Sequence, residues 1–167
     1  MPFRLLPTYR TNAITDLTAD DLHRLDIRLL MLDFDNTIVP YTTNDPSQQI
    51  LDWLKTMLAS DIRLCVVSNS HNDRVRRFCR QHGIDCITHA KKPFSKGIKE
   101  CLARYGIQNS QCALAGDQIY TDILGANCAG IRSVLVRAIH NHNFWLKLRH
   151  VAEMPFIIAA KNRRIPK

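Results

Sequence analysis

Leu29-Leu30-Met31-Leu32-Asp33-Phe34-Asp35-Asn36-Thr37 joins a run of four apolar residues to two carboxylates spaced two positions apart. A short, continuous apolar run is typical of a strand that is buried on both faces of a parallel sheet. Asp33 and Asp35 would then stand in the loop beyond its carboxyl end, where open α/β sheets bind their ligands. Carboxylates in such a place need a positive partner, because burying an unpaired charge is costly. The stretch therefore predicts an α/β fold with an acidic site at one edge of the sheet.

Polar or charged residues also follow three later apolar runs, at Ser68 with Asn69, at Lys92, and at Asp117 with Asp122. Each run is short enough to be a buried strand, and each polar group stands where the run ends. Since ligands gather at the carboxyl ends of parallel strands, we expect these side chains to meet the first acid pair. An ammonium group, hydroxyls and several carboxylates at one place are suited to holding a metal ion and a phosphate ester.

The order of these motifs resembles that of the haloacid dehalogenase superfamily of phosphohydrolases, over roughly residues 28–137. The segments 36–40 and 116–122, and a leader that runs straight into the first acid pair, are similar to the YqeG-type branch. That branch is related to phosphatidylglycerophosphate phosphatases. The resemblance implies a Rossmann-like parallel sheet, a phosphatase activity and a requirement for Mg²⁺.

The resemblance also implies a role for each residue of the catalytic set. Asp33 is the expected nucleophile, which forms an aspartyl-phosphate. Asp35 is the expected general acid, and then the base for the water that hydrolyses this intermediate. Ser68, the backbone N–H of Asn69 and Lys92 are expected to bind the phosphoryl oxygens.

Mg²⁺ is the expected counter-ion of the clustered carboxylates. Its implied ligands are Asp33, Asp117 and the backbone carbonyl of Asp35. Asp122 is expected to support the site by orienting Lys92 or a metal-bound water, and Thr37 is a second supporting residue. The alternative for Asp122 is an ordinary acid in the first turn of a helix, which the helix dipole favours.

Hydrophobic periodicity predicts an alternation of helices and strands. The expected helices cover residues 50–58, 73–82, 95–105 and 120–129, and the expected strands cover 29–32, 62–67, 85–88, 112–115 and 133–136. Alternation of this kind indicates a parallel sheet with helices on both faces. The intervals between the four motifs are too short for an inserted cap domain, so we expect an open site suited to a large substrate.

The 167 residues are expected to form one domain, with a leader at 1–27 that packs on the core and a basic tail at 138–167. The net charge of +8 is concentrated at the end, where residues 137–167 hold seven basic side chains and one acid. Phe144, Trp145, Leu148 and Val151 recur there at helical spacing. They either pack on the edge of the sheet or face the head groups of an anionic membrane.

The sequence thus favours a Mg²⁺-dependent phosphatase that converts phosphatidylglycerophosphate to phosphatidylglycerol. A phosphatase of nucleic-acid ends or other phosphomonoesters is the first alternative, because basic charge serves either polyanion. A non-catalytic RNA- or ribosome-associated module is the second. No apolar run is long enough for a membrane-spanning helix or a signal peptide. We therefore expect a cytoplasmic protein, or one of an organelle matrix in a eukaryote, that attaches peripherally to anionic membranes.

Overall fold

A parallel sheet forms the centre of the protein. The computed structural model describes residues 5–43, 45–71, 73–139 and 144–166, and for residues 144–151 it describes the backbone alone. All neighbouring strands are parallel, in the order β1-β6-β5-β2-β3-β4. The strands are β1 (Tyr9–Thr11), β2 (Leu29–Leu32), β3 (Arg63–Val67), β4 (Asp85–Ile87), β5 (Cys112–Gly116) and β6 (Arg132–Val136).

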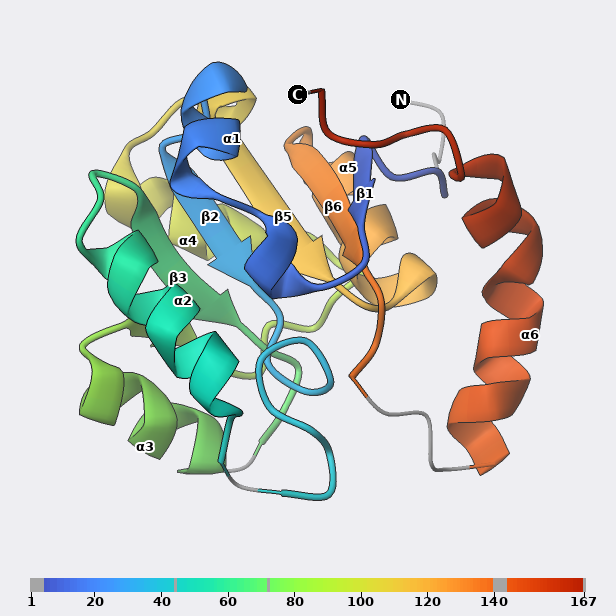
Figure 1. Ribbon diagram of the computed structural model, residues 1–167, viewed down its shortest axis with the longest axis horizontal. Helices are drawn as coiled ribbons and strands as arrows, with labels where there is room; N and C mark the ends of the chain where they lie inside the picture. Colours follow the sequence, from blue (N-terminus) through green and yellow to red (C-terminus); the bar gives the residue numbers. More distant parts are fainter. Residues whose placement is uncertain (1–4, 44, 72, 140–143, 167) are drawn as a thin grey trace.

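Helices cover both faces of this sheet, with α2 and α3 on one side and α4 and α5 on the other (Figure 1). The α-helices are α1 (Ala19–Arg24), α2 (Gln48–Leu58), α3 (Asp73–His82), α4 (Lys96–Tyr105), α5 (Leu124–Ala129) and α6 (Phe144–Ala159). Shorter helical turns are η1 (Ile14–Asp16), η2 (Asn109–Gln111) and the π-helical turn η3 (Ile119–Ile123). The predicted Rossmann-like fold is confirmed.

Strand β2 shows why a continuous apolar run was needed. Leu30 and Leu32 pack into the core beneath α2 and α3, whereas Leu29 and Met31 pack against the opposite layer with α4 and α5. Successive side chains of a strand point to opposite faces, so a strand covered on both sides must be apolar at every position. All four residues are fully buried.

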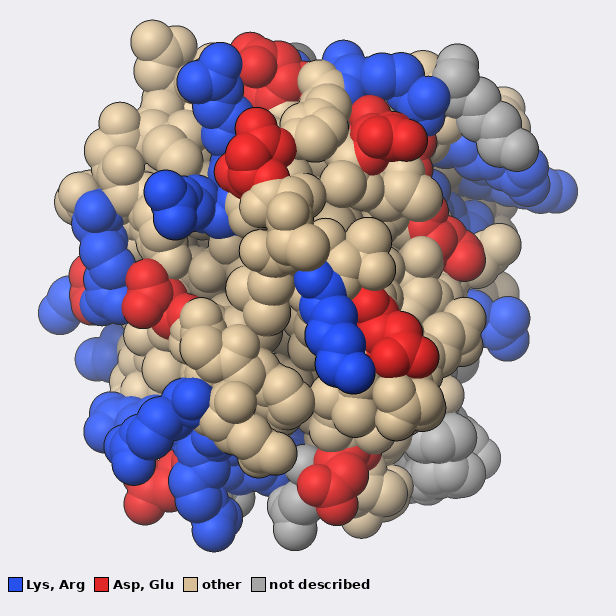
Figure 2. Space-filling model, turned by 60° about the vertical axis from the view of Figure 1, so that its left-hand side comes forward, with Lys and Arg blue, Asp and Glu red and all other residues tan. Residues whose placement is uncertain are grey.

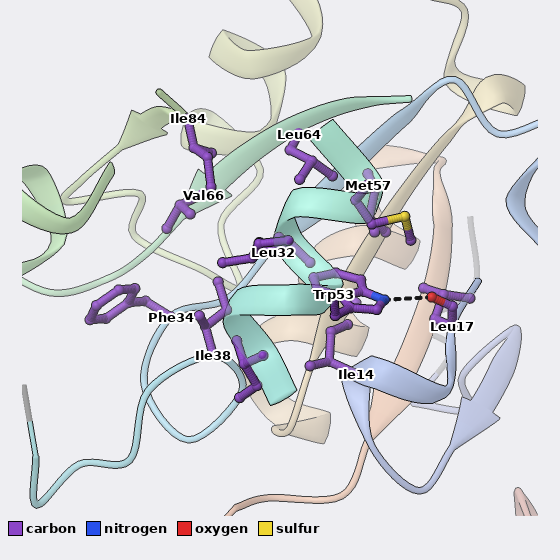
Figure 3. Packing of buried hydrophobic residues seen from close by; sticks show 14 of the residues in the cluster. Ile14, Leu17, Leu32, Phe34, Ile38, Trp53, Met57, Leu64, Val66 and Ile84 are labelled. Carbon is purple, nitrogen blue, oxygen red and sulfur yellow. Dashed lines mark hydrogen bonds between the residues drawn. The ribbon is translucent and has the colours of Figure 1, made fainter. Parts of the chain in front are cut away.

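The leader closes one end of the larger core cluster. Ile14, Leu17 and Leu22 are buried there with Trp53 of α2. The Trp53 indole N–H donates a hydrogen bond of 2.7 Å to the Leu17 carbonyl (Figure 3). A buried indole N–H needs such a partner, so this bond fixes the leader against α2.

Both ends of the chain meet at the β1 edge of the sheet. The Arg10 N–H donates to the Arg163 carbonyl at 2.7 Å, and the backbones of Arg10 and Arg164 form a parallel bridge. Strand β1 was not predicted, because Tyr-Arg-Thr has no apolar run and is only partly buried. The C-terminal segment thus adds to the fold at an edge that the first residues create.

The structure also departs from the predicted helices, since α1 was not among them. The predicted helix at 120–129 begins as the π-helical turn η3 and becomes α-helical only at Leu124. Helix α6 extends over Phe144–Ala159, but the side chains of Phe144, Trp145, Leu148 and Val151 lie outside the described residues. In the part of the chain that is described, no helix combines the length and the apolar character needed to cross a bilayer.

Candidate active site

The predicted site residues gather where the strand order reverses. The chain runs from β2 outward to β3 and β4, then crosses to β5 on the other side of β2. Such a reversal opens a crevice at the carboxyl ends of the strands. A cavity of about 340 Å³ lies there, and Asp33, Asp35, Ser68, Asn69 and Lys92 all line it. The structure therefore brings together five residues that the sequence indicated.

The floor of the site is a cluster of three carboxylates around one ammonium group. Lys92 Nζ lies 2.6 Å from Asp33 Oδ1 and 2.7 Å from Asp122 Oδ1. Carboxylate oxygens of Asp33, Asp117 and Asp122 lie within 4.8 Å of one another. Asp33, Lys92 and Asp122 are buried, and Asp117 is 9% exposed. One buried ammonium group thus pairs with two buried carboxylates, and the carboxylate of Asp117 lies beside them.

This imbalance appears in the protonation of the cluster. Burial raises the pKa of Asp33 to about 7, although the nearby Lys92 opposes that shift. Burial also acts to lower the pKa of Lys92, but the carboxylates of Asp122 and Asp33 outweigh it and hold that pKa above its usual value. Lys92 therefore stays charged, and the excess of negative charge falls on the acids.

The donor set fits a divalent cation. The second oxygen of Asp33, Oδ2, is buried and has no hydrogen-bond partner among the described residues. Asp117 is at hand to share an ion with it, and every donor is an oxygen, which Mg²⁺ prefers. Asp33 and Asp117 are the side chains that would hold the ion, and Asp122 is already occupied by Lys92.

Gly116 permits the close approach of Asp122 to the floor. A Cβ atom at this position would lie 2.4 Å from Asp122 Cγ, which no side chain tolerates. The carboxylate also accepts the Gln118 N–H at 3.1 Å. Asp122 therefore contacts both Lys92 and the backbone of the loop after β5.

Asn69 braces the loop that carries Lys92. Its side-chain oxygen accepts the Lys92 N–H at 2.7 Å, and its amide donates to the Lys92 carbonyl at 2.8 Å. The Ser68 oxygen accepts the Ser70 N–H at 3.0 Å, which leaves the hydroxyl proton to be donated elsewhere. Ser68 is thus oriented by a local turn, and a side-chain role for Asn69 adds to the backbone role that was expected.

Arg74 of α3 contacts Asp35 at the rim and was missed by the sequence analysis. Its guanidinium forms an ion pair with the Asp35 carboxylate and donates to the Thr43 carbonyl at 2.7 Å. It also lies over the Phe34 ring, 5.1 Å from the centroid. Burial raises the pKa of Asp35, and the charge of Arg74 opposes that rise. Arg74 is one of four arginines in α3, so the sequence alone does not distinguish it from the other three.

Thr37 does not join the site. It is fully buried, and it lines a separate cavity of about 180 Å³ near Ile14 and Ile139. The chain turns sharply between the acid pair and this residue, with Asn36 at a φ of +62°.

His89 and Lys91 also have positive φ, so strained backbone flanks the site on two loops.

Glu153 of α6 is a second residue that the sequence analysis missed. Its carboxylate is buried and accepts the Ile119 N–H at 3.0 Å, beside the loop that carries Asp117. The Tyr120 hydroxyl donates to the Ala152 carbonyl at 3.2 Å. Helix α6 therefore contacts the start of η3, directly after the loop that carries Asp117. A single acid in a strongly basic segment was the signal that could have found it.

Comparisons with known proteins agree with this geometry. The HAD-hydrolase-like family profile matches residues 89–143. The probable phosphatase YqeG of Bacillus subtilis is 29% identical over 131 residues, which are 78% of this chain and 76% of that protein.

Solved structures share the fold at low identity. A haloacid dehalogenase-superfamily hydrolase from Ehrlichia chaffeensis has a TM-score of 0.57 and 15% identity, covering 81% of this chain and 98% of its own. The cobalt-bound deoxy-D-mannose-octulosonate 8-phosphate phosphatase of Haemophilus influenzae has a TM-score of 0.55 and 15% identity, covering 86% and 93%. The family profile and the motif order thus both make the chain similar to haloacid dehalogenase-type hydrolases, and the solved structures share its fold.

Proposed function

We propose that this protein is a Mg²⁺-dependent phosphomonoester hydrolase in which Asp33 is the nucleophile. The observation that carries the proposal is the position of Lys92, between Asp33 and Asp122 on the floor of an open cavity. An ammonium group held there meets the charge of a transferring phosphoryl group while it keeps the nucleophile in place. Phosphatase activity also agrees with the similarity to YqeG.

In the first step a carboxylate oxygen of Asp33 attacks phosphorus and the bond from phosphorus to the leaving oxygen breaks. Asp35 gives its proton to that oxygen, so the alcohol leaves neutral and an aspartyl-phosphate remains on Asp33. Asp35 lines the cavity and stands on the rim rather than on the floor. That position suits a proton donor to a group that points outward.

In the second step water attacks the aspartyl-phosphate. Asp35, now a carboxylate, takes a proton from that water while the bond from Asp33 to phosphorus breaks. Inorganic phosphate leaves, Asp33 regains its carboxylate and Asp35 regains its proton. Ser68 and Lys92 hold the phosphoryl oxygens throughout, from two different loops.

The metal belongs to the floor of the site. A bound Mg²⁺ supplies positive charge that offsets the repulsion between nucleophile and phosphate and polarises a phosphoryl oxygen. The side chains of Asp33 and Asp117 hold it in this proposal, with the backbone carbonyl of Asp35 as a further ligand. The buried, unpartnered Oδ2 of Asp33 and the nearby carboxylate oxygen of Asp117 support the presence of such an ion.

The proposed substrate is phosphatidylglycerophosphate at the surface of an anionic membrane. The cavity is open, and no separate domain covers it in the part of the chain that the structure describes. Tyr41 on its wall and Phe94, two residues after Lys92, are large and strongly exposed, at 57% and 74%. Exposed aromatic rings beside basic charge suit a lipid interface. Lys161, Arg163 and Arg164 add exposed positive charge at the end of the chain.

A panel of phosphomonoesters tests this proposal. Phosphate release is measured from phosphatidylglycerophosphate in anionic vesicles, from an oligonucleotide with a terminal phosphate and from glycerol 3-phosphate, each with Mg²⁺ and with chelator. We expect Mg²⁺-dependent release, fastest from the vesicles. Preference for the oligonucleotide would support the nucleic-acid alternative, and no release from any ester would support a non-catalytic module.

A further inference from the structure

A second cavity adjoins the active site and shares one of its walls. It measures about 310 Å³ and lies between α3 and the segment that leads into α2. We name it the α3 groove, and it is lined by Asp45, Leu51, Arg74, Arg77, Phe78 and His82, among others. Arg74 lines both this groove and the catalytic cavity. A molecule whose reacting phosphate lies in the first cavity can therefore reach the second past one side chain.

The groove is built on a chain of stacked rings. The Arg74 guanidinium lies 5.1 Å from the centroid of Phe34, and that ring contacts Phe78 edge-on at 5.3 Å. The His82 ring follows, 4.5 Å from Phe78. Phe34 and Phe78 are buried, so they fix the positions of the groups that stack on them. The cationic wall of the groove is thus held before any ligand arrives.

Positive charge predominates along α3, the helix whose Arg74 and Arg77 line the groove. Arg77 forms no ion pair among the residues that the structure describes, and neither does Asp45, the acid that lines the groove with it. Helix α3 carries Arg74, Arg76, Arg77 and Arg80 against one acid, Asp73. Figure 2 shows basic side chains gathered at the lower left, on the side of the molecule where α3 lies. An anion is the ligand that this surface favours.

We propose that the α3 groove binds a second anionic group of the substrate, a phosphodiester that neighbours the phosphomonoester undergoing hydrolysis. This inference rests on the proposed function and adds a determinant of specificity to it. Arginine suits the task, because its planar guanidinium presents five N–H donors and can serve several acceptors at once. Arg74 would stand between the two phosphates, and Arg77 would bind the diester. The apolar lining from Leu51 and Phe78 favours a diester attached to glycerol carbons over a strongly hydrated polyanion.

Two soluble substrates test the groove, and in both of them the leaving oxygen is a primary oxygen of glycerol. Glycerol 3-phosphate carries the monoester alone, and glycerophosphoglycerol phosphate carries the same terminal monoester and a neighbouring diester. We expect the wild-type kcat/KM to be higher for the second. Arg77→Gln should lower that preference about tenfold, mainly through KM, which is the effect of one charge-assisted hydrogen bond.

Arg80→Gln is the matched control, because it removes the same charge from the same helix outside the groove. It should leave the preference at the wild-type value. Arg74→Gln should lower the preference too, together with a general loss that reflects its contact with Asp35. Thermal unfolding of each variant shows whether the fold is intact.

Three results overturn the inference. Equal kcat/KM for both substrates in the wild type, with no change in Arg77→Gln, would reject the subsite without contradicting the proposed phosphatase activity. An equal effect of Arg77→Gln and Arg80→Gln would show that the preference comes from the overall positive charge of α3 and not from a contact in the groove. An Arg77 dependence seen only with a phosphorylated oligonucleotide assigns the groove to nucleic acid. Failure to hydrolyse any ester is different, because it rejects the proposed function itself and the groove with it.

Discussion

The floor and the rim of the site differ in the ratio of carboxylates to cations and in their access to solvent. On the floor Asp33 and Asp122 share one buried lysine, so two carboxylates compete for a single cation, and the carboxylate of Asp117 lies within 4.8 Å of both. On the rim Asp35 faces Arg74, one charge against one, where solvent has partial access. Two carboxylates only two residues apart thus lie in different environments.

That difference teaches how neighbouring acids acquire different roles. Asp33 is the first residue after β2, and its N–H donates a hydrogen bond of 2.9 Å to the Ala115 carbonyl of the neighbouring strand β5. Asp35 belongs to the loop beyond, where an arginine from another helix meets it. In the proposed mechanism the crowded carboxylates on the floor share a metal ion, and the partly accessible Asp35 on the rim exchanges a proton with solvent or substrate.

The largest expected effect is the loss of turnover in Asp33→Asn. An amide is neither a nucleophile nor a good Mg²⁺ ligand, so kcat should fall by about 10⁴-fold or more, as when other hydrolases lose their nucleophile. Steady-state hydrolysis of an activated aryl phosphate measures this. Substantial residual turnover, with deamidation excluded by mass spectrometry, would move the nucleophile away from the floor.

The next largest effect is on stability, and we expect a substitution on the floor to lower the unfolding free energy more than one on the rim. Lys92→Met leaves the buried acids unpaired and should cost about 3–5 kcal/mol of unfolding free energy. Arg74→Gln should cost less, about 1–3 kcal/mol, because solvent reaches the Asp35 side chain. Urea denaturation in chelator measures both. Equal costs would show that the floor carries no greater strain than the rim.

The pH dependence of stability sharpens the comparison. Burial raises the pKa of Asp33 from 3.8 to about 7, so the folded metal-free protein binds this proton more tightly than the unfolded chain does. Its contribution to stability is full below about pH 4 and is lost as the pH rises through about 7, by at most about 4 kcal/mol. Asp33→Asn should lack this loss. A wild-type protein that gains on that variant as the pH rises would contradict the assigned direction.

Mg²⁺ should stabilise the floor without any substrate. Binding to the folded state alone raises the unfolding free energy by about 2.7 kcal/mol at a hundredfold excess over Kd. Thermal unfolding in a Mg²⁺ titration measures the rise, which should vanish in chelator and shrink in Asp117→Ala. An equal rise in that variant would place the ion elsewhere.

The smallest expected effect comes from the brace behind the floor. Glu153→Ala removes the acceptor of the Ile119 N–H and should weaken Mg²⁺ binding about tenfold, as is common for residues that orient metal ligands. Met154→Ala, one position on and partly exposed, is the control. Calorimetric titration with Mg²⁺ distinguishes the two variants. A fall in kcat at saturating Mg²⁺ with unchanged affinity would instead give Glu153 a role in the chemical step.

Sequence patterns predicted what depends on buried strands. Apolar runs located five of the six strands, and each site motif stood at the end of one, so Asp33, Ser68 and Asp117 could be placed together. Arg74 could not be placed there, because it is one of four arginines in α3, and Glu153, although it is the single acid of the basic tail, carries no pattern that indicates its contact with the loop after β5. Their roles depend on which helix lies behind which loop. Strand β1 was missed because three half-buried residues form no recognisable run.

The sequence and the structure point to different parts of the chain as the membrane-binding surface. The sequence pointed to the basic tail, yet the C-terminal segment pairs with Arg10 at the far edge of the sheet. Tyr41 and Phe94 lie much closer in sequence to the catalytic loops, and both are strongly exposed. We expect vesicle binding to depend on these rings as well as on basic charge.

The central claim is that Asp33 and Asp35 divide the reaction between them, and one trapping experiment tests it most directly. The Asp35→Asn variant is incubated with Mg²⁺ and an activated aryl phosphate, quenched in acid, digested and analysed by mass spectrometry. This variant lacks the base that activates water in the second step. We therefore expect one phosphoryl group to accumulate on Asp33 and to be lost on treatment with hydroxylamine. A phosphoryl group on any other residue, or continued turnover with Asp33 unmodified, would contradict the account.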